Sequence, residues 1–241
     1  MVWCALGIET DKGGVLKVIE VFTGGVGSGK SYHALSKGLA WVECRLRFRR
    51  YVVANFPVIR QNERWIYIPN EQLKPLELVR MSFERGWYGN ESQCLLIIDE
   101  ASVLFNARDW QLKGKERLDW IKFFAQSRKL GYDIVLISQD IRSLDRQVRS
   151  LADVEVKHLA FSRLPYLSWI PRILRLQISF AVSYALRTSF NGIPTVFAVW
   201  PWVAKRYDTM RLFDITYLSL AAEQSGSQDA GVGGPPRLAA S

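Results

Sequence analysis

The chain has 241 residues, of which 49% are hydrophobic, 12% aromatic and 23% charged. These values argue against a disordered chain, and the length suits one substantial core better than two. Lysines and arginines number 32 against 23 aspartates and glutamates, which gives a net charge of +9. Such a balance points to an acidic partner, either nucleic acid or an anionic membrane surface, with a simple solubility charge as the alternative.

Cysteine and histidine usage disfavours two kinds of site. The three cysteines, Cys4, Cys44 and Cys94, form no C-x-x-C pair, which favours a reducing compartment over a disulfide scaffold. Only two histidines are present, so a zinc site is disfavoured. We expect His33 and His158 to serve in packing or at the surface rather than in catalysis.

Neither a signal peptide nor a membrane span is expected. Residues 1–10 lack a basic leader followed by a long apolar core. The most apolar window, 178–203, is interrupted by Arg187, Asn191 and two prolines, so it does not supply the roughly 20 apolar residues that a transmembrane helix needs.

The strongest motif follows an apolar segment, 15–22, that predicts a buried strand. Residues 24–31 then fit G-x-x-x-x-G-K-[ST], the phosphate-loop or Walker A pattern. Glycines let consecutive N–H groups point inward around an anion, and the following helix adds its positive dipole end. The alternative is a glycine turn with an incidental lysine.

A nucleotide site follows from this motif, with ATP as the default because no guanine-specificity motif is evident. Lys30 would reach the β- and γ-phosphates, and the Ser31 hydroxyl would complete a Mg²⁺ shell. The predicted binding residues are Gly24, Gly25, Val26, Gly27, Ser28, Gly29, Lys30, Ser31 and Tyr32.

Apolar residues at helical spacing predict a helix over 30–48, with a basic end that suits the helix dipole or an anionic partner. A strand over 51–58, a short strand near 65–68 and a helix near 75–85 are expected next.

Residues 94–100 read as a buried strand that ends in two carboxylates, the Walker B pattern. Asp99 would hold the magnesium, directly or through water, and Glu100 would act as general base on the attacking water. Alternatively, the pair could only cap the following helix.

An amphipathic helix is predicted over 118–130, with Trp120, Ile121, Phe124 and Leu130 as its buried face. A buried strand over 133–139 follows and ends at Gln139. This amide could orient the lytic water, although an ordinary strand-end amide is the alternative.

The remaining segments predict a helix over 141–152 and strands over 154–161, 177–188 and 193–200, with Asn191-Gly192 as a hairpin turn. Together the elements predict an α/β fold of three layers, with a mainly parallel central sheet and a C-terminal β-hairpin extension. We expect residues 1–14 to be an extension, 15–222 the phosphate-loop domain and 223–241 a flexible Gly/Pro/Ser-rich tail.

Several segments, spread over about 17–215, resemble one family of phosphate-loop ATPases. They are Phe22–Ser31, Ala54–Pro57, Leu96–Ala101, Arg128–Asp133, Ser138-Gln139 and Lys205–Thr209. The chain thereby resembles the ASCE division (additional strand, catalytic glutamate). More narrowly, it is similar to the zonula occludens toxin (Zot) family, the gene I assembly proteins of filamentous phages.

The resemblance implies an FtsK–HerA-like, ATP-hydrolysing motor at the cytoplasmic face of the inner membrane, which powers assembly and extrusion of phage carrying single-stranded DNA. Its expected partners are copies of itself in a ring-like homo-oligomer (a hexamer), phage coat or assembly proteins, and single-stranded DNA. Family members typically continue into a transmembrane helix, which this sequence does not show. Either the sequence is the cytoplasmic domain alone, or attachment to the anionic membrane is through a partner or the basic surface.

The family also implies that an arginine completes a neighbour's site, and Arg128, Arg146 and Arg149 are the candidates, each of which could instead be a surface ion-pair partner. Two other functions stay open. One is a nucleotide-gated assembly scaffold with little turnover, against which Glu100 argues, and the other is a DNA-packaging or conjugative-type translocase.

Overall fold

The computed structural model describes residues 19–43, 50–58, 63–106, 114–160, 177–186 and 194–199. Within them, the strands form one sheet in the order β3-β2-β4-β5-β1-β6-β7-β8. The strands are β1 (Ile19–Thr23), β2 (Tyr51–Ala54), β3 (Trp65–Tyr67), β4 (Cys94–Ile98), β5 (Tyr132–Ile137), β6 (Val154–Ala160), β7 (Gln177–Ala185) and β8 (Pro194–Val199).

The six strands β3-β2-β4-β5-β1-β6 are parallel to one another. β7 pairs antiparallel with β6, and β8 pairs antiparallel with β7, at one side of the sheet. β1 lies between β5 and β6, with Phe22 opposite Ile137 on one side and Val156 on the other. The carboxyl ends of β1, β2, β4 and β5 therefore meet at one edge, where open α/β sheets bind ligands.

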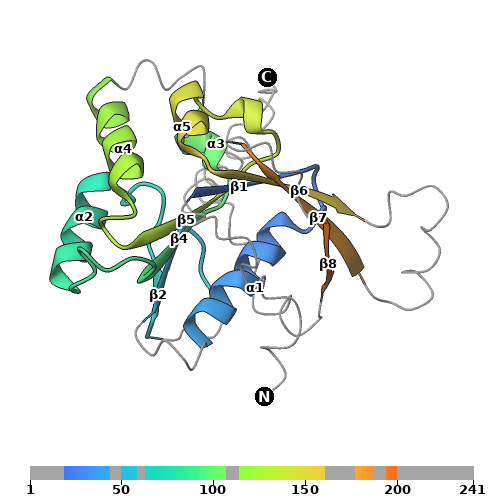
Figure 1. Cartoon of the computed structure of the whole chain (residues 1–241), viewed down its shortest axis with the longest axis horizontal. Coiled ribbons are helices and arrows are strands. Elements are labelled where there is room, and N and C mark those ends of the chain that lie inside the picture. The colour runs from blue at the N-terminus through green and yellow to red at the C-terminus, as the bar shows by residue number, and fades with distance from the viewer. Residues whose placement is uncertain are drawn as a thin grey trace, which may run out of the picture. The chain divides into compact units, whose positions relative to one another are not determined.

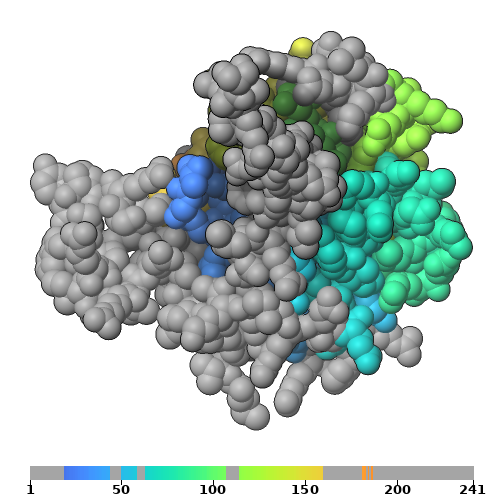
Figure 2. All heavy atoms as spheres, turned by 180° about the vertical axis from the view of Figure 1, so that it is seen from behind, coloured from blue at the N-terminus to red at the C-terminus, as the bar shows by residue number. Residues whose placement is uncertain are grey.

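Helices cover both faces of the parallel strands (Figure 1). They are α1 (Lys30–Glu43), α2 (Pro75–Glu84), α3 (Ala101–Leu104), α4 (Gly114–Gln126), the 3₁₀ turn η3 (Ile141–Ser143) and α5 (Arg146–Leu151). α1 packs on one face, whereas α2, α4 and α5 pack on the other, where α2 and α4 lie side by side (Figures 1 and 2). The predicted three-layer α/β fold is confirmed.

Strand alternation explains the two cores. In β4, Leu95 and Ile97 face α1, while Leu96 and Ile98 face the opposite layer. All five residues of β4 are buried, as is typical of a parallel strand covered on both faces. Cys94 begins this strand as a buried thiol, and its burial raises the pKa.

Aromatic side chains dominate the layer formed by α2 and α4. Trp120, Phe124 and Phe105 pack edge-on or tilted with ring centroids 5.0–5.4 Å apart, and the ring centroid of Phe123 lies 5.3 Å from that of Tyr132 in β5. Tyr132 also donates its hydroxyl hydrogen to the Leu78 carbonyl of α2 at 2.8 Å. These contacts fix α2 and α4 against the start of β5.

Two sequence predictions need correction. On α4 the buried residues are Trp120, Phe123 and Phe124, while Ile121 is only half-buried. The helix predicted over 141–152 is broken into η3 and α5, because Asp145 leaves the helical conformation and accepts the Gln147 N–H as the cap of α5. A polar cap in mid-segment interrupts a helix that periodicity alone would continue.

Several predictions fall outside the described residues: the extension 1–14, the helix end at 44–49, the Asn191-Gly192 turn and the tail 223–241. In the part of the chain that the structure describes, no helix has both the length and the apolar character needed to cross a membrane.

Candidate nucleotide-binding site

The glycine loop joins the end of β1 to the start of α1, as the motif requires. Gly24, Gly27 and Gly29 have φ angles of 140°, 74° and 88°, a region that residues with side chains rarely adopt. Gly24 is also closely packed, since an added Cβ would lie 2.4 Å from the His158 carbonyl oxygen. Its N–H donates to the Gln139 carbonyl at 3.2 Å, so the loop begins between β5 and β6.

Lys30, the first residue of α1, bends back over this loop. Its Nζ donates to the carbonyl oxygens of Gly24 at 2.7 Å and Gly25 at 2.9 Å. The ammonium therefore lies at the loop, where an anionic phosphate would compete with these carbonyls for it.

The other predicted loop residues differ in exposure. Val26 is 70% exposed at the loop, and Ser28 is buried. Ser31 is half-buried in the first turn of α1. Tyr32 packs partly against the core on the α1 side, so the structure gives it a packing contact.

The carboxylates that follow β4 lie at the same sheet edge. Asp99 is buried, whereas Glu100 is exposed and has a φ of 49°. Asp99 Oδ1 accepts the Glu100 N–H at 2.8 Å. Glu100 makes no side-chain cap bond to α3, so the helix-capping alternative gains no support.

Asn55, which sequence reasoning did not single out as a site residue, fixes this pair from the end of β2. Its Oδ1 accepts the Asp99 N–H at 2.7 Å, and its Nδ2 donates to the Asp99 carbonyl at 2.8 Å. Nδ2 also donates to Asn70 Oδ1 at 2.8 Å. The signal that could have found it is a polar residue directly after an apolar strand of a parallel sheet.

Gln139 follows β5 and touches the loop through its backbone, while its side chain is exposed. The neighbouring Ser138 is buried, and its hydroxyl contacts the Asp140 carbonyl at 3.0 Å and Ser143 Oγ at 2.8 Å. These bonds shape the turn into η3 and leave the Gln139 amide at the sheet edge.

The three candidate arginines occupy different places. Arg128 precedes β5, at the end of the sheet opposite the glycine loop, and pairs with Glu91 at 2.8 Å on the surface. Arg146 and Arg149 lie on α5 and line a shallow open pocket with Ile141, Ser150, Glu155 and Leu186. The Nε of Arg149 is buried without a hydrogen-bond partner among the described residues.

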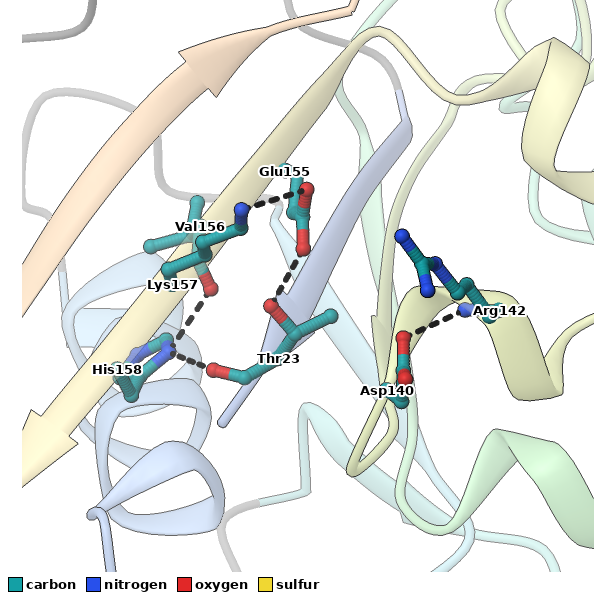
Figure 3. A network of polar contacts seen from close by, with 7 residues as sticks. All are labelled: Thr23, Asp140, Arg142, Glu155, Val156, Lys157 and His158. Atoms are coloured by element: carbon teal, nitrogen blue, oxygen red, sulfur yellow. Dashed lines mark hydrogen bonds and ion pairs between the residues drawn. The ribbon is translucent and has the colours of Figure 1, made fainter. Parts of the chain in front are cut away.

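A polar network surrounds Thr23, the last residue before the loop (Figure 3). Its hydroxyl donates to Glu155 Oε1 at 2.7 Å, and both side chains are buried. His158 Nδ1 lies 3.2 Å from the Thr23 carbonyl and 3.0 Å from that of Val156. Since carbonyls only accept, Nδ1 carries the hydrogen.

The second nitrogen of His158 completes a histidine pair. Its Nε2 lies 2.8 Å from His33 Nδ1, and the tautomer makes Nε2 the acceptor. Both rings also pack against Phe22. Burial lowers the pKa of His158 to about 4. The pKa of His33 lies well below its usual value, mainly because of burial and to a smaller extent because of electrostatic repulsion from His158 and Lys37.

Comparison with known proteins agrees with this arrangement. A family model described as zonular occludens toxin (Zot) matches residues 18–163. The chain belongs to the Zot family. The Zot match begins one residue before β1 and ends beyond β6, so it includes the loop, both carboxylates and Gln139.

Relatives of this Zot chain include two phage proteins. The Gene 1 protein of Salmonella phage IKe is 29% identical over 156 residues, which is 60% of this chain and 40% of that protein. The Gene 1 protein of Escherichia phage If1 is 29% identical over 137 residues, or 54% and 38%. The chain thus spans about two-fifths of the length of these relatives.

Among solved structures, the N-terminal domain of zonular occludens toxin from Neisseria meningitidis superimposes with a TM-score of 0.55. The match covers 80% of this chain and 100% of that domain at 16% identity. This likeness supports the Zot fold of the chain and, at that identity, the fold alone.

Proposed function

We propose that the chain is an ATP-hydrolysing motor domain that drives assembly and extrusion of a filamentous phage. One observation carries the proposal: the glycine loop, the Asp99-Glu100 pair and Gln139 lie at the ends of neighbouring parallel strands. The Gene 1 phage relatives supply the biological setting.

The residues divide the chemistry among them. Backbone N–H groups of the loop and the Lys30 ammonium would hold the phosphates. Oxygens of Ser31 and Asp99 are the hard donors that Mg²⁺ prefers, and the ion would neutralise charge that develops on the phosphates. Glu100 would take the proton from the attacking water, and Gln139 would orient that water.

The backbone of Glu100 supports this role. A non-glycine residue with a φ of 49° is strained, and such strain tends to collect at functional sites. The Asn55 bonds hold the backbone N–H and carbonyl of Asp99, so the backbone that leads into Glu100 is fixed in place. Its exposed carboxylate is free to meet water at the sheet edge.

Self-association belongs to the same proposal. An arginine from a neighbouring copy would stabilise charge in the transition state, and such a finger is worth about 10³–10⁵ in rate. Arg146 and Arg149 are better candidates than Arg128, which lies at the opposite end of the sheet and is paired with Glu91. We propose a ring, with a hexamer as the expected size.

The proposal also covers what the motor moves and where in the cell it acts. The net charge of +9 suits single-stranded DNA or an anionic membrane surface. We place the domain at the cytoplasmic face of the inner membrane, where it would act with phage coat or assembly proteins.

The test is steady-state phosphate release by the wild type and by Glu100→Gln. The matched control is Glu116→Gln, because Glu116 is an exposed residue of α4. We expect Glu100→Gln to lower the rate by about two orders of magnitude, with Glu116→Gln close to wild type. A wild type that binds ATP without turnover, even when concentrated, would instead favour the nucleotide-gated scaffold.

Adding single-stranded DNA to the same assay separates the possible substrates. A motor that contacts DNA should release phosphate faster with DNA present, and the stimulation should weaken as salt rises. If DNA does not stimulate phosphate release at low salt, coat protein becomes the favoured substrate of the motor.

A further inference from the structure

We propose that β6 is part of the nucleotide site, with His158 as a positioning residue that ties the two ends of the phosphate loop together. The inference rests on the proposed nucleotide binding. It concerns residues outside the Walker motifs, since His158 lies on the strand that pairs with β1 on the side away from β5.

His158 reaches both ends of the loop through one ring. Nδ1 shares its hydrogen between the carbonyls of Val156 at 3.0 Å and Thr23 at 3.2 Å, and Thr23 directly precedes Gly24. Nε2 accepts from His33, which lies two residues beyond Ser31 in α1. The ring is 1% exposed, so water does not compete for these bonds (Figure 3). A single side chain thus connects the residue before the loop with a residue of α1 just beyond it.

The backbone of His158 also restricts the residue type at the start of the loop. The His158 carbonyl oxygen lies so close to Gly24 that only a glycine fits there. Gly24 in turn donates to Gln139 on the other side. The first loop peptide is therefore confined between β5 and β6, in addition to being tied by the ring.

Glu155 supports Thr23 from the opposite face of the sheet. Val154 and Val156 of β6 face α1, as does the ring of His158. Glu155 faces α5 instead, where it accepts the Thr23 hydroxyl. Thr23 is thus held through its hydroxyl on one side and its carbonyl on the other.

Positioning follows from this geometry because the loop binds phosphate with fixed N–H groups. Donors that are already aimed at the ligand lose little when it binds, whereas a mobile loop must first be ordered. A buried polar pair is also costly unless fully hydrogen-bonded, so the two histidines specify one arrangement of the loop ends.

The test compares His158→Leu with His158→Asn in equilibrium binding of ATPγS with Mg²⁺. Leu keeps much of the volume but donates no hydrogen bond, whereas the Asn amide can replace Nδ1 as the donor to Thr23. We expect Leu to weaken affinity about tenfold, and Asn to recover most of the loss. The KM for ATP should move with affinity, and kcat should move less.

Leu159→Ala is the matched control, because Leu159 is the next residue of β6 and is exposed. It should bind as the wild type does. Wild-type affinity in His158→Leu would overturn the inference, and so would an Asn variant that binds more weakly than Leu, because packing alone predicts that order.

Thr23→Val and Thr23→Ser provide a second pair in case His158→Leu does not fold. Val removes the hydroxyl that Glu155 accepts, and Ser keeps it. A severalfold loss of affinity in Val, mostly restored in Ser, supports the inference, whereas equal affinities contradict it. A wild type that binds no nucleotide would overturn the proposed function itself, which separates the two failures.

Discussion

Asn55 illustrates how a single side chain can fix the proposed catalytic segment. Its amide makes two bonds to the backbone of Asp99, the residue before the proposed base. Asn55→Ala would remove both of these buried hydrogen bonds, at a cost of about 1–3 kcal/mol in the free energy of unfolding. Phosphate release should also fall, because Glu100 loses its anchor.

Urea unfolding and phosphate release check this prediction. Asn90→Ala removes a side-chain amide that donates to the Gly86 carbonyl at an exposed position, and it serves as the control. Unchanged hydrolysis in Asn55→Ala would show that Asp99 and Glu100 need no support from β2.

Gly24 and Gly27 separate steric conflict from backbone strain. Gly24→Ala would place Cβ 2.4 Å from the His158 carbonyl, whereas an added Cβ at Gly27 meets nothing within 4 Å. We expect Gly27→Ala to cost about 1–2 kcal/mol from its positive φ, and Gly24→Ala to cost more. Equal losses in chemical denaturation would place the carbonyl of β6 farther from the loop than the structure has it.

His158 should make stability depend on pH. Its pKa falls from an ordinary value near 6.5 to about 4 in the folded protein, mainly because the ring is buried. Between these values the unfolded chain binds a proton that the folded chain does not, so folding weakens as the pH drops from 6.5 towards 4. The hydrogen bonds to the Thr23 and Val156 carbonyls raise the pKa, the charge of Lys30 lowers it, and His33 faces the other ring nitrogen.

The comparison of wild type with His158→Asn measures this effect together with its coupling to His33, whose pKa His158 also lowers, because the remaining groups titrate in both proteins. The stability advantage of the wild type, measured by urea unfolding, should shrink between pH 7.5 and pH 5, a range that brackets the ordinary histidine pKa. An advantage that stays constant would mean that the ring accepts a proton in the folded state.

At the scale of elements, α4 offers a direct comparison of two neighbouring positions. Phe123 is 2% exposed and touches Tyr132, whereas Ile121 is half-buried. Phe123→Ala should cost about 3–5 kcal/mol in the free energy of unfolding. Ile121→Ala should cost clearly less, and the opposite order would contradict the packing of α4 described above.

The same helix shows where sequence reasoning succeeds and fails. Apolar spacing located α4, but a stripe of three or four residues is compatible with more than one rotation, so Ile121 was predicted in place of Phe123. Strands buried on both faces, such as β4, were predicted well because their apolar runs are uninterrupted. The break at Asp145 was missed because capping competes with periodicity.

At the scale of the molecule, the sequence predicted the three-layer fold and the buried strands after which the site motifs lie. The glycine loop and the carboxylate pair were readable because each motif is continuous. Asn55, Glu155 and His158 were not singled out as site residues, because their partners lie 44 to 135 positions away and only the strand order β2-β4-β5-β1-β6 brings them together.

ATP hydrolysis with Glu100 as the proposed base is tested most directly by identifying the nucleotide that remains bound. Wild type and Glu100→Gln would each be incubated with labelled ATP and Mg²⁺, separated from free nucleotide, and analysed. The proposed role of Glu100 predicts ADP on the wild type and intact ATP on Glu100→Gln. Intact ATP on both, or ADP on both, would contradict it.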